Sequence, residues 1–209
     1  MNIKLPLATI LASATLWLSS PAEAQPTRSI GNGVTTLRLS STFSTLLRDE
    51  GIQIRPFEES TTVRGTTLFP INEGVIDFAN ASGEIEHAGG QRLVSSDTAV
   101  RLINYIIDST QPTPTLTAAL VVNDKFVGRA PLFDVKFSNL ATPLQARRGT
   151  LRFTNVTLTL RSEGALALNE AFGTTAFVEG QAYGTASINM TIGKSATIPI
   201  RTSSRNVEE

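Results

Sequence analysis

The sequence predicts a mainly β protein, either an antiparallel β-sandwich or a strongly curled sheet, with two short helices. Three observations predict this class. Runs of alternating apolar and polar residues recur along the chain, as half-buried strands require. Glycines such as Gly83 and the Gly89–Gly90 pair separate these runs, as turns or bulges do. Apolar residues at helical spacing occur in only two short stretches.

The chain of 209 residues is long enough for a single domain that follows an export signal. Lys4, an apolar run over residues 5–18 and the small-residue pattern Ala22-Glu23-Ala24 indicate a signal peptide over residues 1–24. We therefore expect an exported protein, whether periplasmic, cell-surface or secreted. Residues 25–33 are expected to form a flexible leader, residues 34–202 one β-rich domain, and residues 203–209 a polar tail.

Composition excludes several classes of function. Lys plus Arg and Asp plus Glu both number 18, so overall charge predicts neither a nucleic-acid partner nor an anionic membrane partner. The chain has no cysteine, which excludes disulfides, thiol nucleophiles and cysteine zinc sites. No stretch after the signal is apolar for 18 consecutive residues, so no transmembrane segment is expected once the signal is removed.

The strands are predicted from alternation. In the strongest one, residues 99–108, Asn104 is expected on one face and Tyr105 on the other, with apolar residues on both. Pro70 lacks an amide donor and is expected at a sheet edge or strand end. Asn123–Asp124 predicts a two-residue hairpin turn. The other expected strands are residues 34–40, 52–59, 66–71, 74–78, 115–122, 125–137, 150–161, 185–192 and 196–200.

The two helices are predicted over residues 41–50 and 162–172. Phe43, Leu46 and Leu47 share one face of the first, which Ser41 or Thr42 can cap and Gly51 can end. The second helix presents an apolar face that includes Leu168, and Gly173 can close it. Both apolar faces are expected to pack on the core.

The candidate binding residues are the only histidine and the only two tyrosines. His87 is the one side chain that titrates near neutrality, and Glu84 or Glu86 could orient it. Tyr105 and Tyr183 could each ligate a haem iron as a phenolate. A structural role is open for each of the three. His87 would be a turn residue bonded to a carbonyl or water, Tyr105 a core residue, and Tyr183 an exposed loop residue.

The order of these motifs resembles that of the HtaA domain, a secreted or cell-surface β-rich domain of haem uptake systems. The resemblance covers about residues 35–173 and rests on two segments. One is the Gly-x-x-x-His-x-Gly-Gly pattern from Gly83 to Gly90, and the other runs from Ser162 to Phe172. It implies a haem held by a tyrosine that a histidine supports. His87 matches the histidine segment, whereas Leu46 stands in the place of the tyrosine.

The residues predict a non-enzymatic, exported binding or surface module. Its partner would be haem or another small hydrophobic ligand, held by His87, Tyr183 and Tyr105, or a component of the cell envelope. The alternative is a structural or adhesive envelope domain with no small-molecule site. A hydrolase is a third hypothesis, which the single histidine and the absence of a Gly-x-Ser-x-Gly elbow make the weakest.

Overall fold

A computed structural model describes residues 27–195 of the chain, which form eleven strands and two helices. The expected signal peptide (1–24), the last expected strand (196–200) and the polar tail (203–209) lie outside the described residues. The elements in chain order are β1 Thr27–Leu39, α1 Ser41–Asp49, β2 Gln53–Phe57, β3 Thr61–Val63, β4 Thr66–Asp77, β5 Gly83–His87, β6 Gly90–Val94, β7 Ala99–Asp108, β8 Thr115–Val122, β9 Lys125–Phe137, β10 Thr150–Leu160, α2 Ser162–Phe172 and β11 Ala182–Ser195.

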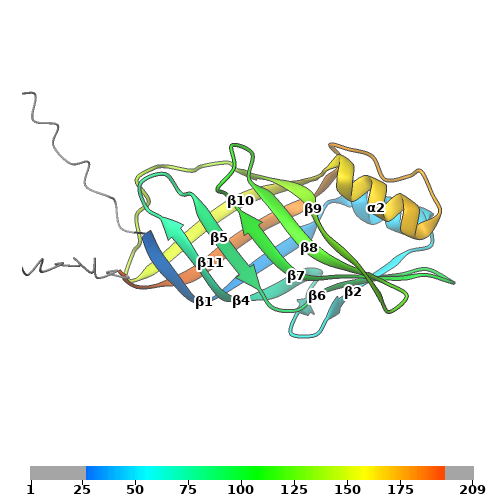
Figure 1. Cartoon of the computed structure of the whole chain (residues 1–209), viewed down its shortest axis with the longest axis horizontal. Helices are drawn as coiled ribbons and strands as arrows, with labels where there is room; N and C mark the ends of the chain where they lie inside the picture. Colours follow the sequence, from blue (N-terminus) through cyan, green and yellow to red (C-terminus); the bar gives the residue numbers. More distant parts are fainter. Residues whose placement is uncertain (1–26, 196–209) are drawn as a thin grey trace, which may run out of the picture.

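Eight of the strands close into an antiparallel barrel (Figure 1). The ring runs β7-β5-β4-β1-β11-β10-β9-β8 and closes because β7 pairs with both β5 and β8. The mainly β class and the two helices are therefore confirmed, and the sheet is a closed barrel rather than a sandwich. Closure pairs every strand of the ring on both sides and removes the exposed edges of an open sheet.

A smaller sheet continues from the barrel at one end. We call it the side sheet and define it as β2, β6 and the segments paired beside them, which are residues 99–103 of β7, 119–122 of β8 and 125–129 of β9. β3 lies off this path and pairs with β4. Figure 1 shows both helices together at one end of the barrel.

A side-chain hydrogen bond caps the start of α1, and a left-handed glycine follows or closes the end of each helix. The residue that caps α1 is Ser40, one position before those expected, since its hydroxyl accepts from the Phe43 amide at 3.0 Å. The same hydroxyl donates to the Ala182 carbonyl at 2.5 Å, which ties the helix to β11. Gly51 and Gly173 adopt the left-handed conformation at the two C-terminal ends, as predicted.

One expectation about β1 was wrong, and one about β4 is confirmed in part. Residues 27–33, expected as a flexible leader, form the first half of β1 and pair with β4 and β11. Pro70 lies inside β4 and not at its end, but it falls in a local gap between the pairing with β3, which stops at Leu68, and the pairing with β5, which starts at Ile71. Its carbonyl accepts from the Ala88 amide at 2.9 Å, just past the end of β5. In an antiparallel sheet the N–H and C=O groups of one residue point to the same neighbouring strand. The amide that Pro70 lacks would therefore point toward Ala88, where the pairing of β4 with β5 has already ended.

A bulge in β7 reverses the facing that simple alternation predicts. Asn104 has a φ of 52°, and the pairing with β8 shifts register between Ile103 and Ile106. One extra residue changes the phase of alternation, so Tyr105 points inward together with Leu102 and not outward with Ile103. Asn155 in β10 has a φ of 54° and marks an equivalent register shift.

The turn between β8 and β9 agrees with the prediction from the sequence. Asn123 and Asp124 both have positive φ and form the predicted two-residue turn between β8 and β9.

One continuous apolar core fills the barrel and runs under both helices, from Ile188 inside to Phe43 and Leu168. Among residues 27–195, neither helix is long and apolar enough to cross a membrane.

Candidate functional site

The barrel encloses a cavity of about 30 Å³. Every strand of the ring and β6 contribute to its wall, which consists of Thr35, Leu37, Phe69, His87, Gln91, Tyr105, Ile107, Leu116, Val135, Val156, Leu158, Tyr183 and Ala186. The three residues selected from the sequence therefore lie around one cavity, although they are separated by up to 96 positions in the chain (183 − 87). A pocket that takes a drug-sized molecule measures roughly 300–1,000 Å³, so this cavity is about tenfold too small for one.

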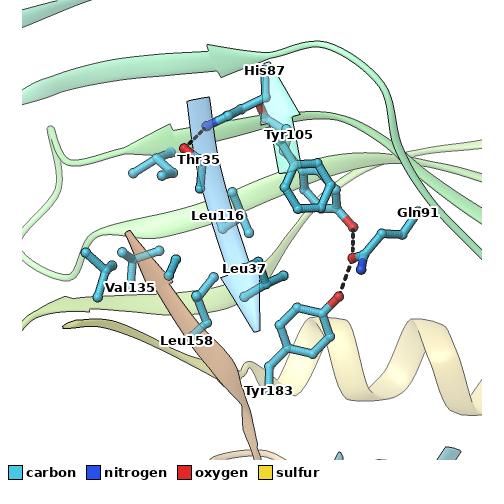
Figure 2. A pocket seen from close by; sticks show the side chains of 13 residues that line it. Thr35, Leu37, His87, Gln91, Tyr105, Leu116, Val135, Leu158 and Tyr183 are labelled. Carbon is cyan, nitrogen blue, oxygen red and sulfur yellow. Dashed lines mark hydrogen bonds between the residues drawn. The ribbon is translucent and has the colours of Figure 1, made fainter. Parts of the chain in front are cut away.

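His87 is buried at the end of β5 and has both ring nitrogens bonded, and Figure 2 shows the bond to Thr35. Nδ1 lies 3.1 Å from the Tyr105 carbonyl and Nε2 lies 2.7 Å from the Thr35 hydroxyl. A carbonyl only accepts, so Nδ1 carries the proton and Nε2 of the neutral ring accepts from Thr35. Burial lowers the pKa of His87 to about 4, partly offset by the bond to the Tyr105 carbonyl. The ring is therefore neutral at physiological pH.

Tyr105 and Tyr183 share one acceptor. The Tyr105 hydroxyl donates to Oε1 of Gln91 at 3.1 Å, and the Tyr183 hydroxyl donates to the same oxygen (Figure 2). Burial raises the pKa of both tyrosines above the ordinary value of a phenol. Both hydroxyls are therefore protonated and occupied within the barrel. We refer to these three residues as the Tyr–Gln–Tyr bridge.

Tyr183 was expected in an exposed loop and is instead only 2% exposed. It is the second residue of β11, where the pairing with β10 shifts register between Leu158 and Thr159. Its ring stacks on Phe133 with centroids 4.1 Å apart and meets Phe43 edge-on at 4.8 Å. Tyr183 thus joins the barrel interior to the buried face of α1. The expectation that Tyr105 belongs to the core is confirmed.

Other residues named from the sequence lie away from this cavity. Glu84 and Glu86 occupy the outer face of β5, since alternation places His87 on the inner face, and they do not orient its ring. Leu46 lies outside the barrel on α1, where it lines a shallow hollow with Thr42 and Gln181. His87 and Leu46 therefore line separate spaces, and the histidine does not support the position that the family resemblance gives to the tyrosine.

A haem does not fit the interior cavity in this conformation. The cavity is too small, and the ring nitrogens and hydroxyls that would meet iron are all engaged in hydrogen bonds. A tyrosine must ionise to ligate iron, and burial opposes ionisation of both tyrosines. Ligand binding by His87, Tyr105 and Tyr183 stays a prediction that the closed barrel does not support.

A larger hollow lies outside the barrel between α1 and β2. We call it the α1–β2 hollow, and it has a volume of about 370 Å³. Its apolar side chains come from the end of β1, from α1 and from the segment that leads into β2, and a guanidinium stands at its rim. The lining residues are Leu39, Ser44, Leu47, Arg48, Gly51, Ile52, Gln53 and Ile54.

Sequence reasoning missed Thr35 and Gln91, which hold the buried histidine and tyrosines. Both were detectable from period-two alternation. Gln91 follows Ile85 and His87 at even steps along β5 and β6, and Thr35 precedes inward-facing Leu37 by two residues. A polar residue that keeps phase with core residues is expected inside and must find a partner there. Within residues 27–195, no three His, Cys, Asp or Glu side chains gather into a metal-binding group.

Comparison with known proteins gives matches by structure only, since no family model and no curated protein matches the sequence. The C-terminal domain of HtaA from Corynebacterium glutamicum has a TM-score of 0.61 and 17% identity, covering 79% of this chain and 99% of that domain. The N-terminal domain of HtaA gives 0.57 and 13%, with 77% and 97% covered. The haem-binding protein HtaB from the same organism gives 0.52 and 15%, with 80% and 95% covered. The resemblance inferred from the motifs is thus found in three dimensions, and the chain shares the fold of the HtaA domains.

Proposed function

We propose that this protein is a non-enzymatic binding module that holds a small hydrophobic carboxylate, with haem as the leading candidate, in the α1–β2 hollow. The observation that carries the proposal is the contrast between the two spaces. The interior cavity of about 30 Å³ has its polar groups paired, whereas the outer hollow of about 370 Å³ is open and has an apolar floor. The likeness to the haem-binding protein HtaB supports haem as the ligand class.

The chemistry of the hollow suits an apolar molecule with an acidic edge. Leu39 and Ile54 are half-buried and offer aliphatic surface, and its burial would contribute to binding. Arg48 at the rim has an exposed guanidinium that lies 3.7 Å from the Asp49 carboxylate. A ligand carboxylate can take a shorter, charge-assisted hydrogen bond from the same guanidinium.

The proposal implies that iron contributes little to affinity. Among the described residues, the histidine, both tyrosines and Met190 are all buried in the core, and Leu46 replaces the tyrosine that the family resemblance places on α1. A porphyrin would therefore be held by apolar contact and by its carboxylates. In this respect the protein would differ from a module that ligates iron through tyrosine.

Export and the place of action belong to the same proposal. The signal-peptide pattern of residues 1–24 supports delivery across a membrane. A protein outside the cytoplasm that takes up a hydrophobic ligand would carry or store it in the cell envelope. The cell-envelope partner expected from the sequence would then receive or present that ligand.

The test is a pair of titrations of residues 25–209, one with haemin and one with iron-free protoporphyrin IX. We expect the two dissociation constants to agree within about threefold, because iron is not ligated. We expect Ile54→Gln in the hollow to weaken the binding of both porphyrins. The control Val75→Gln, at an exposed site on β4, should leave the affinity for both porphyrins unchanged. A ligated Soret band that disappears in Tyr183→Phe or His87→Ala would contradict the proposal and favour an interior site.

A second candidate is the structural or adhesive envelope domain. The side sheet favours it, because its outer face carries several arginines and the 69%-exposed Phe126. Failure of both porphyrins to bind would leave this as the better function. The two candidates use different surfaces, so variants of the hollow and of the side sheet separate them.

A further inference from the structure

The outer face of the side sheet carries a row of arginines that cross-strand pairing places side by side. Arg55 of β2 lies opposite Arg92 of β6, and Arg92 lies opposite Arg101 of β7. Neighbouring strands are ~4.8 Å apart, so three guanidinium stems leave the sheet along a line of roughly 10 Å. We call these three residues the arginine row. The chain has equal numbers of basic and acidic residues, so overall composition does not account for such a cluster.

The row is poorly neutralised by the protein itself. Arg101 pairs with Asp124 at 2.9 Å, but that carboxylate is 89% exposed and is screened by water. No described carboxylate lies within ion-pair distance of Arg55 or Arg92, and Arg55 bonds instead to the Gln53 amide oxygen at 2.8 Å. Like charges directly opposite each other on a sheet are destabilising. The protein therefore carries a repulsion that a bound anion would relieve.

Apolar and aromatic surface borders the arginine row. The next residues in register are Val121 of β8 and Phe126 of β9. Phe57 lies near the other end, with the Arg101 guanidinium 5.4 Å from the centre of its ring. Arg129 lies on the same face, opposite Ala119. The face thus combines guanidinium groups in a line with rings that can pack against the apolar faces of sugars.

Linear anionic polymers match this arrangement better than a membrane does. A chain with regularly spaced carboxylates, sulfates or phosphates can meet successive guanidinium groups, each through two hydrogen bonds. The tip of the side sheet carries Asp97 and Asp124 in its two turns, and these acids oppose insertion into an anionic bilayer. We propose that the outer face of the side sheet binds an anionic polysaccharide through the arginine row.

The test measures binding of two probe polymers, heparin and polygalacturonate, to residues 25–209 at 0.15 M NaCl. In Arg55→Gln/Arg92→Gln we expect the dissociation constant to rise at least about tenfold and the salt dependence to weaken. The matched control Arg38→Gln/Arg152→Gln removes the same charge from exposed sites on β1 and β10 and leaves affinity within about twofold. Thermal unfolding of each variant checks that the fold is intact.

Several results would overturn the inference. Absence of binding of both polymers to the wild-type protein would reject the ligand class. An equal loss of affinity in the control variant would reduce the effect to overall charge. Binding of phosphatidylglycerol vesicles or single-stranded DNA that depends on Arg55 and Arg92, without binding of either polysaccharide, would assign the row to a different partner. None of these outcomes depends on whether porphyrins bind the α1–β2 hollow.

Discussion

The polar side chains inside the barrel form two hydrogen-bonded sets that meet at Tyr105. His87 joins β1 to β7 through the Thr35 hydroxyl and the Tyr105 carbonyl, and the Tyr–Gln–Tyr bridge joins β6, β7 and β11. Each set links strands that are distant in sequence. Buried groups that bond in this way add specificity to a core, because an alternative packing would leave them unpaired.

We predict that His87 makes stability depend on pH below neutrality. Its folded-state pKa of about 4 lies below the unfolded value of 6.5, so the unfolded state binds the proton first. Stability is therefore complete above pH 6.5 and falls as pH drops from 6.5 to 4, by ~3 kcal/mol from this group. Urea denaturation of wild type and His87→Gln at pH 7 and pH 4.5 measures the difference. Identical pH profiles in the two proteins would refute the assignment.

The Tyr–Gln–Tyr bridge predicts an ordering of two substitutions. Tyr183→Phe removes one donor and leaves Gln91 bonded to Tyr105, at a cost of about 1 kcal/mol. Gln91→Leu leaves two buried hydroxyls without their acceptor, at a cost of roughly 2–5 kcal/mol. Equilibrium unfolding in denaturant measures both. If Tyr183→Phe were the more damaging change, the shared acceptor would not be the centre of the bridge.

For the individual elements, the local sequence predicts where a strand lies. It does not always predict which of the strand's side chains face the barrel interior. In the second half of β1 the alternation is regular, and Leu37 lies on the inner face; in β5 it is regular as well, and it places His87 inside with Ile85. In β7 the bulge at Asn104 changes the phase, so Tyr105 is buried as predicted but shares the inner face with Leu102, whereas alternation places it with Ile103. The signal was present, because asparagine in the middle of a strand tolerates positive φ.

The bulge in β7 predicts a specific response to substitution. Asn104→Gly keeps the left-handed conformation and changes the free energy of unfolding by less than about 0.5 kcal/mol. Asn104→Val places a β-branched residue at a φ of 52° and costs roughly 1–2 kcal/mol. Thermal unfolding of the two variants gives the comparison. Equal stability of the two would show that the left-handed backbone is not needed there.

The arginine row predicts a stabilising substitution. Arg92→Thr removes the charge between Arg55 and Arg101 and favours strand geometry, so stability rises by ~0.5 kcal/mol. Arg101→Thr instead loses the Asp124 ion pair and the contact with Phe57, and stability falls by a similar amount. Chemical denaturation at low salt measures both changes. A loss of stability in Arg92→Thr would mean that the row is already compensated within the protein.

At the scale of the whole molecule, the sequence predicts the class but not the closure. Alternation and turn residues indicate strands, and helical spacing predicts both helices, because these signals are local. The ring closes through the pairing of β7 with both β5 and β8, and the apolar faces of these strands would suit a sandwich equally well. Barrel closure depends on strand tilt and register, which local patterns do not record.

The sequence predicts some residues of the interior cavity but not the contacts between them. His87 is the only histidine, and Tyr105 and Tyr183 are the only tyrosines, so the sequence alone selects them as candidates. All three line the interior cavity. Their hydrogen bonds within the barrel depend on Thr35 and Gln91, whose inward position alternation indicates but whose partners come from strands that only the fold brings together. The α1–β2 hollow and the arginine row arise from elements brought together by the fold, so neither has a motif in the sequence.

The proposed function requires a barrel interior that is purely structural and a ligand that is held outside it. Two-dimensional amide NMR of residues 25–209, recorded while iron-free protoporphyrin IX is added, tests this most directly. We predict shifts at Leu39 and from Leu47 to Ile54, with Thr35, His87, Tyr105 and Tyr183 unchanged. Shifts centred on the latter four residues, with the α1–β2 hollow unaffected, would contradict the claim and place the ligand inside an opened barrel.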